Sequence, residues 1–103
     1  AGKIEWVVSF APSDGDPIAE IYDEEGKIAK TEVLPCRPPV NCPFIMADVE
    51  PGVYTAALAY GGNRYYYVDG LSLITTPNDA ESATSIEVTE TITPFLEINV
   101  DVC

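Results

Sequence analysis

The sequence contains no histidine and few basic residues: 5 Lys and Arg stand against 17 Asp and Glu, for a formal net charge of −12. The lack of histidine removes the commonest general base and the commonest zinc ligand. The acidic excess repels nucleic-acid phosphates and anionic membrane surfaces, so we expect no nucleic-acid partner. No apolar run reaches the roughly 18 residues of a membrane-spanning helix, so no membrane span is expected.

Two further patterns are missing. No stretch of the chain sustains the i, i+3, i+4, i+7 apolar spacing of an amphipathic helix. No Gly-rich phosphate loop precedes a helix, and no Ser or Cys nucleophile has a histidine base. A domain of 103 residues also has little room for a cleft between two catalytic acids. We therefore expect no enzymatic activity.

What the sequence does contain is apolar alternation with a period of two. Residues 3–10 place large apolar side chains on one face and mostly polar ones opposite; the apolar set is Ile4, Trp6, Val8 and Phe10. From Ile86 to Val102 the even positions are again mostly apolar, and Pro94 marks either a bulge or a break between two strands. Both ends of the chain are therefore expected to be strands.

Turn residues punctuate the chain between these ends. Residues 23–26 and 61–63 indicate hairpins, and residues 51–52 indicate a tight Pro-Gly turn. The segment 35–43 holds four prolines and cannot be an interior strand. This spacing predicts an all-β fold: a two-sheet antiparallel sandwich of seven or eight strands, immunoglobulin-like or prealbumin-like, with residues 1–103 as one domain.

The segment 17–60 begins Pro-Ile-Ala-Glu-Ile-Tyr-Asp-Glu-Glu-Gly-Lys and ends Ala-Asp-Val-Glu-Pro-Gly-Val-Tyr-Thr-Ala-Ala-Leu-Ala-Tyr. This succession of a strand, a D-x-x-G hairpin, a strand and a V-x-P-G-x-Y turn resembles carboxypeptidase regulatory-like and Cna-B-type domains. A cysteine-containing loop stands where those domains have a short turn. The resemblance implies a prealbumin-like sandwich that serves as a stalk, adhesion module, pilus shaft or accessory domain and is seldom catalytic itself.

Three cysteines are present. Cys36 and Cys42 flank a proline-rich loop and are predicted to form a disulfide, which leaves Cys103 as a candidate for a bond to another molecule. The alternative is three reduced, buried thiols. A disulfide-closed loop and a first residue Ala in place of Met are typical of a secreted chain whose signal peptide has been removed. We therefore expect an extracellular or cell-surface location.

Calcium is the one cofactor that the sequence suggests. Asp14 and Asp16 flank a glycine and offer two carboxylates to a hard cation. The other interpretation is that acidic residues in loops serve solubility alone.

Consecutive tyrosines suggest a carbohydrate site. On a strand, Tyr65 and Tyr67 share one face and Tyr66 points to the other. A row of exposed tyrosines could stack on sugar rings. The other interpretation places Tyr66 in the core and its neighbours in cross-strand packing pairs.

The first strand and the loop that follows it, residues 11–17, suggest assembly. Such a strand can complete the sheet of a neighbouring copy, with Ile4, Trp6, Val8 and Phe10 filling the neighbour's core. Head-to-tail donation builds a filament. The sequence thus predicts a secreted structural module, a pilus-like filament or cell-surface subunit, whose partners are copies of itself or neighbouring surface proteins. The alternatives are a monomer with both terminal strands in its own sheets, and a carbohydrate-binding or accessory domain of a larger secreted protein.

Overall fold

The computed structural model describes residues 1–11, 16–36 and 41–101. These residues form β-strands and no helix, and so include no helix long and apolar enough to cross a membrane. The strands are β1 (Gly2–Phe10), β2 (Ile18–Tyr22), β3 (Ile28–Val33), β4 (Cys42–Val49), β5 (Gly52–Tyr60), β6 (Asn63–Tyr66), β7 (Ile86–Val88) and β8 (Phe95–Val100).

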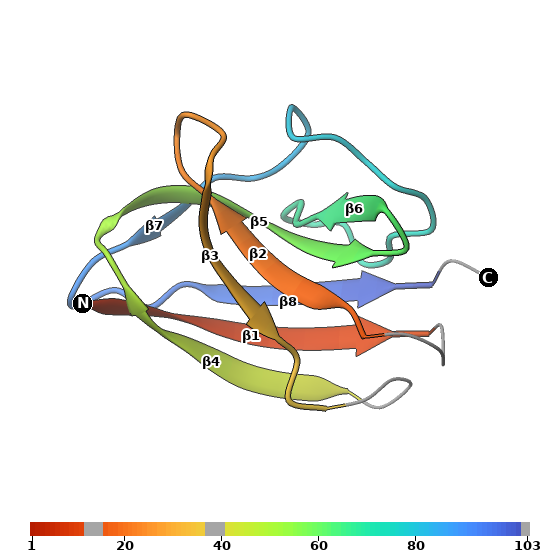
Figure 1. Cartoon of the computed structure of the whole chain (residues 1–103), viewed down its shortest axis with the longest axis horizontal. Coiled ribbons are helices and arrows are strands. Elements are labelled where there is room, and N and C mark those ends of the chain that lie inside the picture. Colours follow the sequence, from red (N-terminus) through yellow and green to blue (C-terminus); the bar gives the residue numbers. More distant parts are fainter. Residues whose placement is uncertain (12–15, 37–40, 102–103) are drawn as a thin grey trace.

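The strands form two sheets, which Figure 1 shows one in front of the other. The three-stranded sheet has the order β4-β1-β8, and the five-stranded sheet has the order β3-β2-β5-β6 with β7 beside the first half of β5. The predicted all-β fold with two sheets is confirmed. The prediction of purely antiparallel pairing is wrong, because β1 and β8 run parallel. The finer assignment to an immunoglobulin-like or prealbumin-like topology stays a prediction.

The core lies between the two sheets and follows the alternation in the sequence. The predicted apolar face of β1 is confirmed: Ile4, Trp6, Val8 and Phe10 are at most 2% exposed. Opposite them, the five-stranded sheet contributes Ile21 and Leu58, while β8 contributes Leu96 and Ile98 from the same side as β1. A period of two therefore decides which side chains of each strand enter the core.

Two predicted turns are confirmed by their backbone. In the hairpin between β2 and β3, the Asp23 amide donates to the Lys27 carbonyl (2.8 Å) and Gly26 has φ 83°. Between β5 and β6, Gly61 and Gly62 have φ 60° and 81°. Glycine takes these left-handed conformations without a steric penalty, which explains why the chain reverses here.

The short apolar run at residues 71–74 forms only an isolated bridge. Ile74 pairs in parallel with Val100 of β8, and the Asn99 side chain donates to the Ser72 carbonyl (3.1 Å). This short contact covers the C-terminal end of β8 and satisfies part of its free edge.

Candidate functional site

Strand β1 is the centre of the three-stranded sheet. It pairs antiparallel with β4, from Gly2 opposite Val49 to Val8 opposite Cys42. It pairs parallel with β8, from Glu5 opposite Phe95 onward. In Figure 1 the two parallel strands run side by side toward the same end of the molecule. Within the single chain, β1 therefore occupies its own sheet, as the monomeric alternative requires.

The other two strands of this sheet depend on β1. Among the described residues, β4 has no strand partner except β1, and β8 has only β1 and the bridge to Ile74. Without β1, the facing edges of β4 and β8 would expose unpaired backbone groups together with the core side chains Met46 and Ile98. The gap between β4 and β8 is therefore a groove that only an extended strand can fill, and we call it the β1 groove.

Trp6 lies at the middle of the β1 groove. Its ring is 0% exposed and stacks on Phe44 of β4 with centroids 5.5 Å apart and an interplanar angle of 15°. Within the described part of the chain, its indole Nε1 has no hydrogen-bond partner. Because Trp6 is the only tryptophan of the chain, its fluorescence reports whether β1 is seated in the groove.

The outward face of the same sheet carries apolar side chains. Ile45 and Phe95 lie on either side of Glu5 and are 53% and 54% exposed. Pro43 stands opposite Val7 in the next row and is also exposed. Clustered exposed apolar side chains are typical of interaction surfaces, so β1 lies between a buried core and an outward face suited to contact with other molecules.

The predicted disulfide is present. Cys36 and Cys42 are bonded, with Cα atoms 5.5 Å apart. Cys42 is 2% exposed and is the first residue of β4, where it stands opposite Val8 of β1. The bond therefore anchors the end of β4 that borders the β1 groove. Cys103 lies outside the described residues, and its predicted intermolecular bond stays a prediction.

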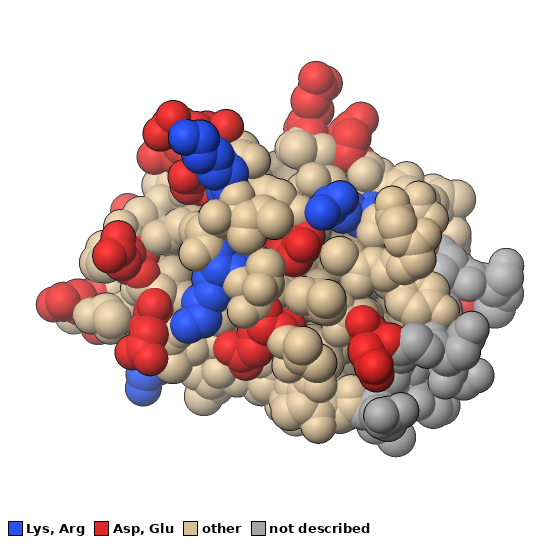
Figure 2. Space-filling model, viewed as in Figure 1, with Lys and Arg blue, Asp and Glu red and all other residues tan. Residues whose placement is uncertain are grey.

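The calcium prediction concerns residues that the structure describes only in part. Asp14 lies outside the described residues, and Asp16 is exposed. Among the residues that are described, no three Cys, Asp or Glu side chains lie together in a way that could hold a metal ion. In Figure 2, acidic side chains are spread over the visible face with a few basic ones among them.

The predicted row of exposed tyrosines is wrong for Tyr65, which is 3% exposed and faces the core opposite Leu58. Tyr67 is partly buried against the core, and its hydroxyl donates to the Asp69 carboxylate (3.4 Å). The alternative interpretation, which placed Tyr66 in the core, is also wrong, because Tyr66 lies on the outer face of β6 and Tyr65 on its inner face. Which tyrosines face the core depends on the register between β5 and β6. Three tyrosines in a row do not reveal this register, because a shift of one residue places a tyrosine on either face.

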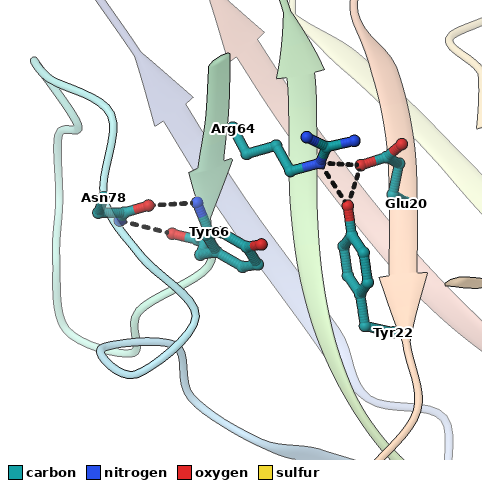
Figure 3. A network of polar contacts seen from close by, with 5 residues as sticks. All are labelled: Glu20, Tyr22, Arg64, Tyr66 and Asn78. Carbon is teal, nitrogen blue, oxygen red and sulfur yellow. Dashed lines mark hydrogen bonds and ion pairs between the residues drawn. The ribbon is translucent and has the colours of Figure 1, made fainter. Parts of the chain in front are cut away.

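A polar network that sequence reasoning missed lies on the outer face of the five-stranded sheet (Figure 3). Glu20 of β2 is 6% exposed, although it is an acid. Its Oε1 accepts hydrogen bonds from the Arg64 Nε (3.0 Å) and from the Tyr22 hydroxyl, and the Arg64 Nε also donates to the Tyr22 oxygen. The buried acid is therefore paired with both a charge and a neutral donor.

Small residues of β5 make this network possible. Glu20 and Arg64 stand on strands that flank β5, opposite Ala57 and Ala59 respectively. Because these alanines have no long side chains, the two charged groups meet above the strand between them. Burial together with the hydrogen bond to Glu20 raises the pKa of Tyr22 to about 12. Spacing along the sequence could not reveal this pair, since 44 residues separate its members.

Next to the network, Asn78 covers the free edge of β6. Its side-chain oxygen accepts from the Tyr66 amide (2.6 Å), and its nitrogen donates to the Tyr66 carbonyl (3.1 Å), as Figure 3 shows. One side chain thus replaces a neighbouring strand at this residue. The arrangement opposes extension of the five-stranded sheet past β6.

Comparison of this chain with protein-family models, curated proteins and solved structures gave no match. The resemblance of residues 17–60 to carboxypeptidase regulatory-like and Cna-B-type domains therefore stays a prediction from turn motifs.

Proposed function

We propose that this chain is a secreted structural module that assembles by exchange of β1. In this proposal, β1 of one copy fills the β1 groove of the next copy. The observation that carries the proposal is the position of β1 between β4 and β8, neither of which has another full strand partner among the described residues.

The exchange preserves the contacts that hold the single chain together. One segment, residues 11–17, joins β1 to the strands that follow it. A strand supplied by another copy makes the same hydrogen bonds and buries the same four side chains, Ile4, Trp6, Val8 and Phe10. The free energy of exchange is then set by the entropy of association and by segment 11–17, so the exchanged form is favoured as protein concentration rises.

Burial of β1 makes the assembled form long-lived. Each of its four large apolar side chains is worth about 1.5–3 kcal/mol when buried, or about 6–12 kcal/mol together before the cost of ordering the strand. A strand must leave the groove before a subunit can dissociate. Because head-to-tail exchange leaves one free β1 and one open groove at the ends, it continues into a filament.

The disulfide supports the extracellular part of the proposal. Disulfides persist in oxidising compartments and are rare in the cytosol. The Cys36–Cys42 bond also anchors β4 beside the groove, where it keeps the acceptor edge in place while β1 is exchanged.

Peptide complementation tests the proposal on the full chain. A variant with Ile4→Asp, Trp6→Phe and Val8→Asp, called the disabled chain, cannot seat its own β1 because two carboxylates would enter the core. A synthetic peptide of residues 1–11 then supplies the only tryptophan. We expect the peptide to shift its emission to shorter wavelength in a saturable manner and to restore the β-sheet circular dichroism of the disabled chain.

The control for this experiment is a peptide that carries the same two aspartates at positions 4 and 8. It is expected not to bind. Emission of the unmodified peptide that stays at the wavelength of exposed tryptophan at every concentration of the disabled chain would contradict the proposal.

Carbohydrate binding by an accessory domain is the second candidate. The observation that favours it is the partly exposed ring of Tyr66 on the outer face of the five-stranded sheet, 5.9 Å from the buried ring of Tyr22, which contacts Arg64. Retention of the protein on insoluble polysaccharides, reduced by Tyr66→Ala, is the expected result. Equal recovery of both proteins in the unbound fraction would contradict it.

A further inference from the structure

The N-terminal end of the β1 groove has no room for a side chain. Gly2 is buried, and a Cβ at this position would lie 2.4 Å from Cγ1 of Val88, 2.9 Å from the Thr89 carbonyl oxygen and 3.3 Å from the Val49 carbonyl oxygen. Two of these three atoms belong to the backbone and cannot rotate away. The groove is therefore closed at this end by β7, which comes from the opposite sheet.

A second feature marks the same place. The pairing of β1 with β4 shifts by one residue between Gly2 and Ile4, because β4 has a bulge there. Asp48, within the bulge, has φ 58°, a left-handed conformation that Asp adopts more readily than most residues. A bulge accepts its partner strand in one alignment only, so the groove has a defined register at the end where Gly2 lies.

These two features limit how a strand can be placed. A shift of one residue would turn Ile4, Trp6 and Val8 out of the core. A shift of two residues in one direction would bring Ile4 against Val88 and the carbonyl groups that already exclude a Cβ. A shift of two residues in the other direction would put Gly2 where the Ile4 side chain fills the core and would leave a cavity.

We propose that the β1 groove is a peptide-binding site for an extended strand of pattern Gly-x-Ile-x-Trp-x-Val-x-Phe, parallel to β8, and that Gly2 fixes its register. For a strand donated by another copy, this inference rests on the proposed function. The chemical class of ligand is a peptide with a glycine at its first inward position, a large aromatic side chain four residues later, and no inward charge.

Another strand of this chain shows what the site rejects. β5 also begins with glycine and alternates apolar residues from Gly52 to Tyr60, but it carries Ala56 where β1 carries Trp6. Alanine would leave the space beside Phe44 empty. The site therefore distinguishes β1 from a strand of similar alternation within the same chain.

The first test uses the full chain and needs no exchange. Gly2→Ala is expected to lower the melting temperature by about 5–15 °C, because an inserted methyl group forces the surroundings to shift. Lys3→Ala, the exposed neighbour, is the matched control and is expected to change little. In a Val88→Ala background, Gly2→Ala is expected to cost less, because the atom at 2.4 Å is gone.

Equal melting temperatures for Gly2→Ala and Lys3→Ala would overturn the inference, as would an equal cost of Gly2→Ala in both backgrounds. This comparison of Gly2→Ala in the two backgrounds tests the role of Gly2 even if β1 is never exchanged between copies.

The second test adds peptides of residues 1–11 to the disabled chain. The Gly2→Ala peptide is expected to bind about tenfold more weakly or worse than the unmodified peptide, and the Lys3→Ala peptide to bind equally well. If the unmodified peptide fails to bind, the proposed function is wrong. The melting temperatures of the Gly2 and Val88 variants then still decide the role of Gly2 within one chain. If the unmodified and Gly2→Ala peptides bind equally, the register inference is wrong and the exchange proposal stands.

Discussion

Reduction of the Cys36–Cys42 disulfide is expected to destabilise the whole domain, because the bond holds the strand that borders the β1 groove. Cys42 is the first residue of β4 and stands opposite Val8. β4 has no strand partner except β1 among the described residues. Loosening the start of β4 therefore also loosens the C-terminal half of β1.

The magnitude follows from the size of the ring that the bond closes. The two cysteines are separated by 6 positions. Closing such a short ring removes denatured-state entropy worth about 2.4 kcal/mol. Cys42 is 2% exposed, and its reduced thiol still fills the same space, so no cavity is added. For a domain of ordinary stability, about 5–15 kcal/mol, this is a large fraction of the free energy of unfolding.

Urea unfolding with and without reductant measures the effect. In a Cys103→Ser background, which prevents thiol exchange, the urea midpoint is expected to fall by about 1–2 M on reduction. A Cys36→Ala/Cys42→Ala variant should fall at least as far and should not respond to reductant. If mass spectrometry shows complete reduction and the midpoint is unchanged, the disulfide does not stabilise the domain and this prediction is wrong.

Three other substitutions have expected outcomes in urea unfolding. Arg64→Met leaves Glu20 without its cation and should lower the free energy of unfolding by about 1–2 kcal/mol, reduced from the cost at a fully buried site because the Arg64 side chain is 44% exposed; unchanged stability would contradict the network. The raised pKa of Tyr22, about 12 against 10, contributes stability that is complete below pH 10 and is lost as the pH rises toward 12, so Tyr22→Phe should lose less stability over that interval; parallel pH profiles would contradict this. Trp6→Phe removes the indole N–H, which has no partner among the described residues, and should cost less than about 2 kcal/mol, against about 3–5 kcal/mol for Trp6→Ala; similar costs for the two variants would contradict this.

The sequence predicted those parts of the fold that depend on neighbouring residues. The alternation in β1 placed its four large apolar side chains at alternate positions from Ile4 to Phe10 on the core face, and Gly26 marked the hairpin before β3. Pro94 indicated a bulge or a break, and the structure shows the break: Pro94 lies between β7 and β8, because proline lacks the amide that a sheet requires. Each of these signals acts within a few residues along the chain.

The parts that the sequence did not predict depend on contacts between distant segments. The parallel pairing of β1 with β8 joins the two ends of the chain, and alternation alone contains no strand direction. The burial of Glu20 depends on Arg64 and on the small Ala57 between them. The lack of space for a side chain at Gly2 comes from Val88, a distant segment of the chain. The available signal in the sequence was the glycine itself, because a glycine in a strand can indicate close approach of another backbone.

The most direct test of strand exchange is the mass of the native protein in solution across a wide range of concentration, by light scattering coupled to size-exclusion chromatography. Strand exchange predicts a series of multiples of the one-chain mass that extends to filaments after unfolding and refolding at high concentration. A single species of one-chain mass at every concentration, before and after refolding, would contradict strand exchange.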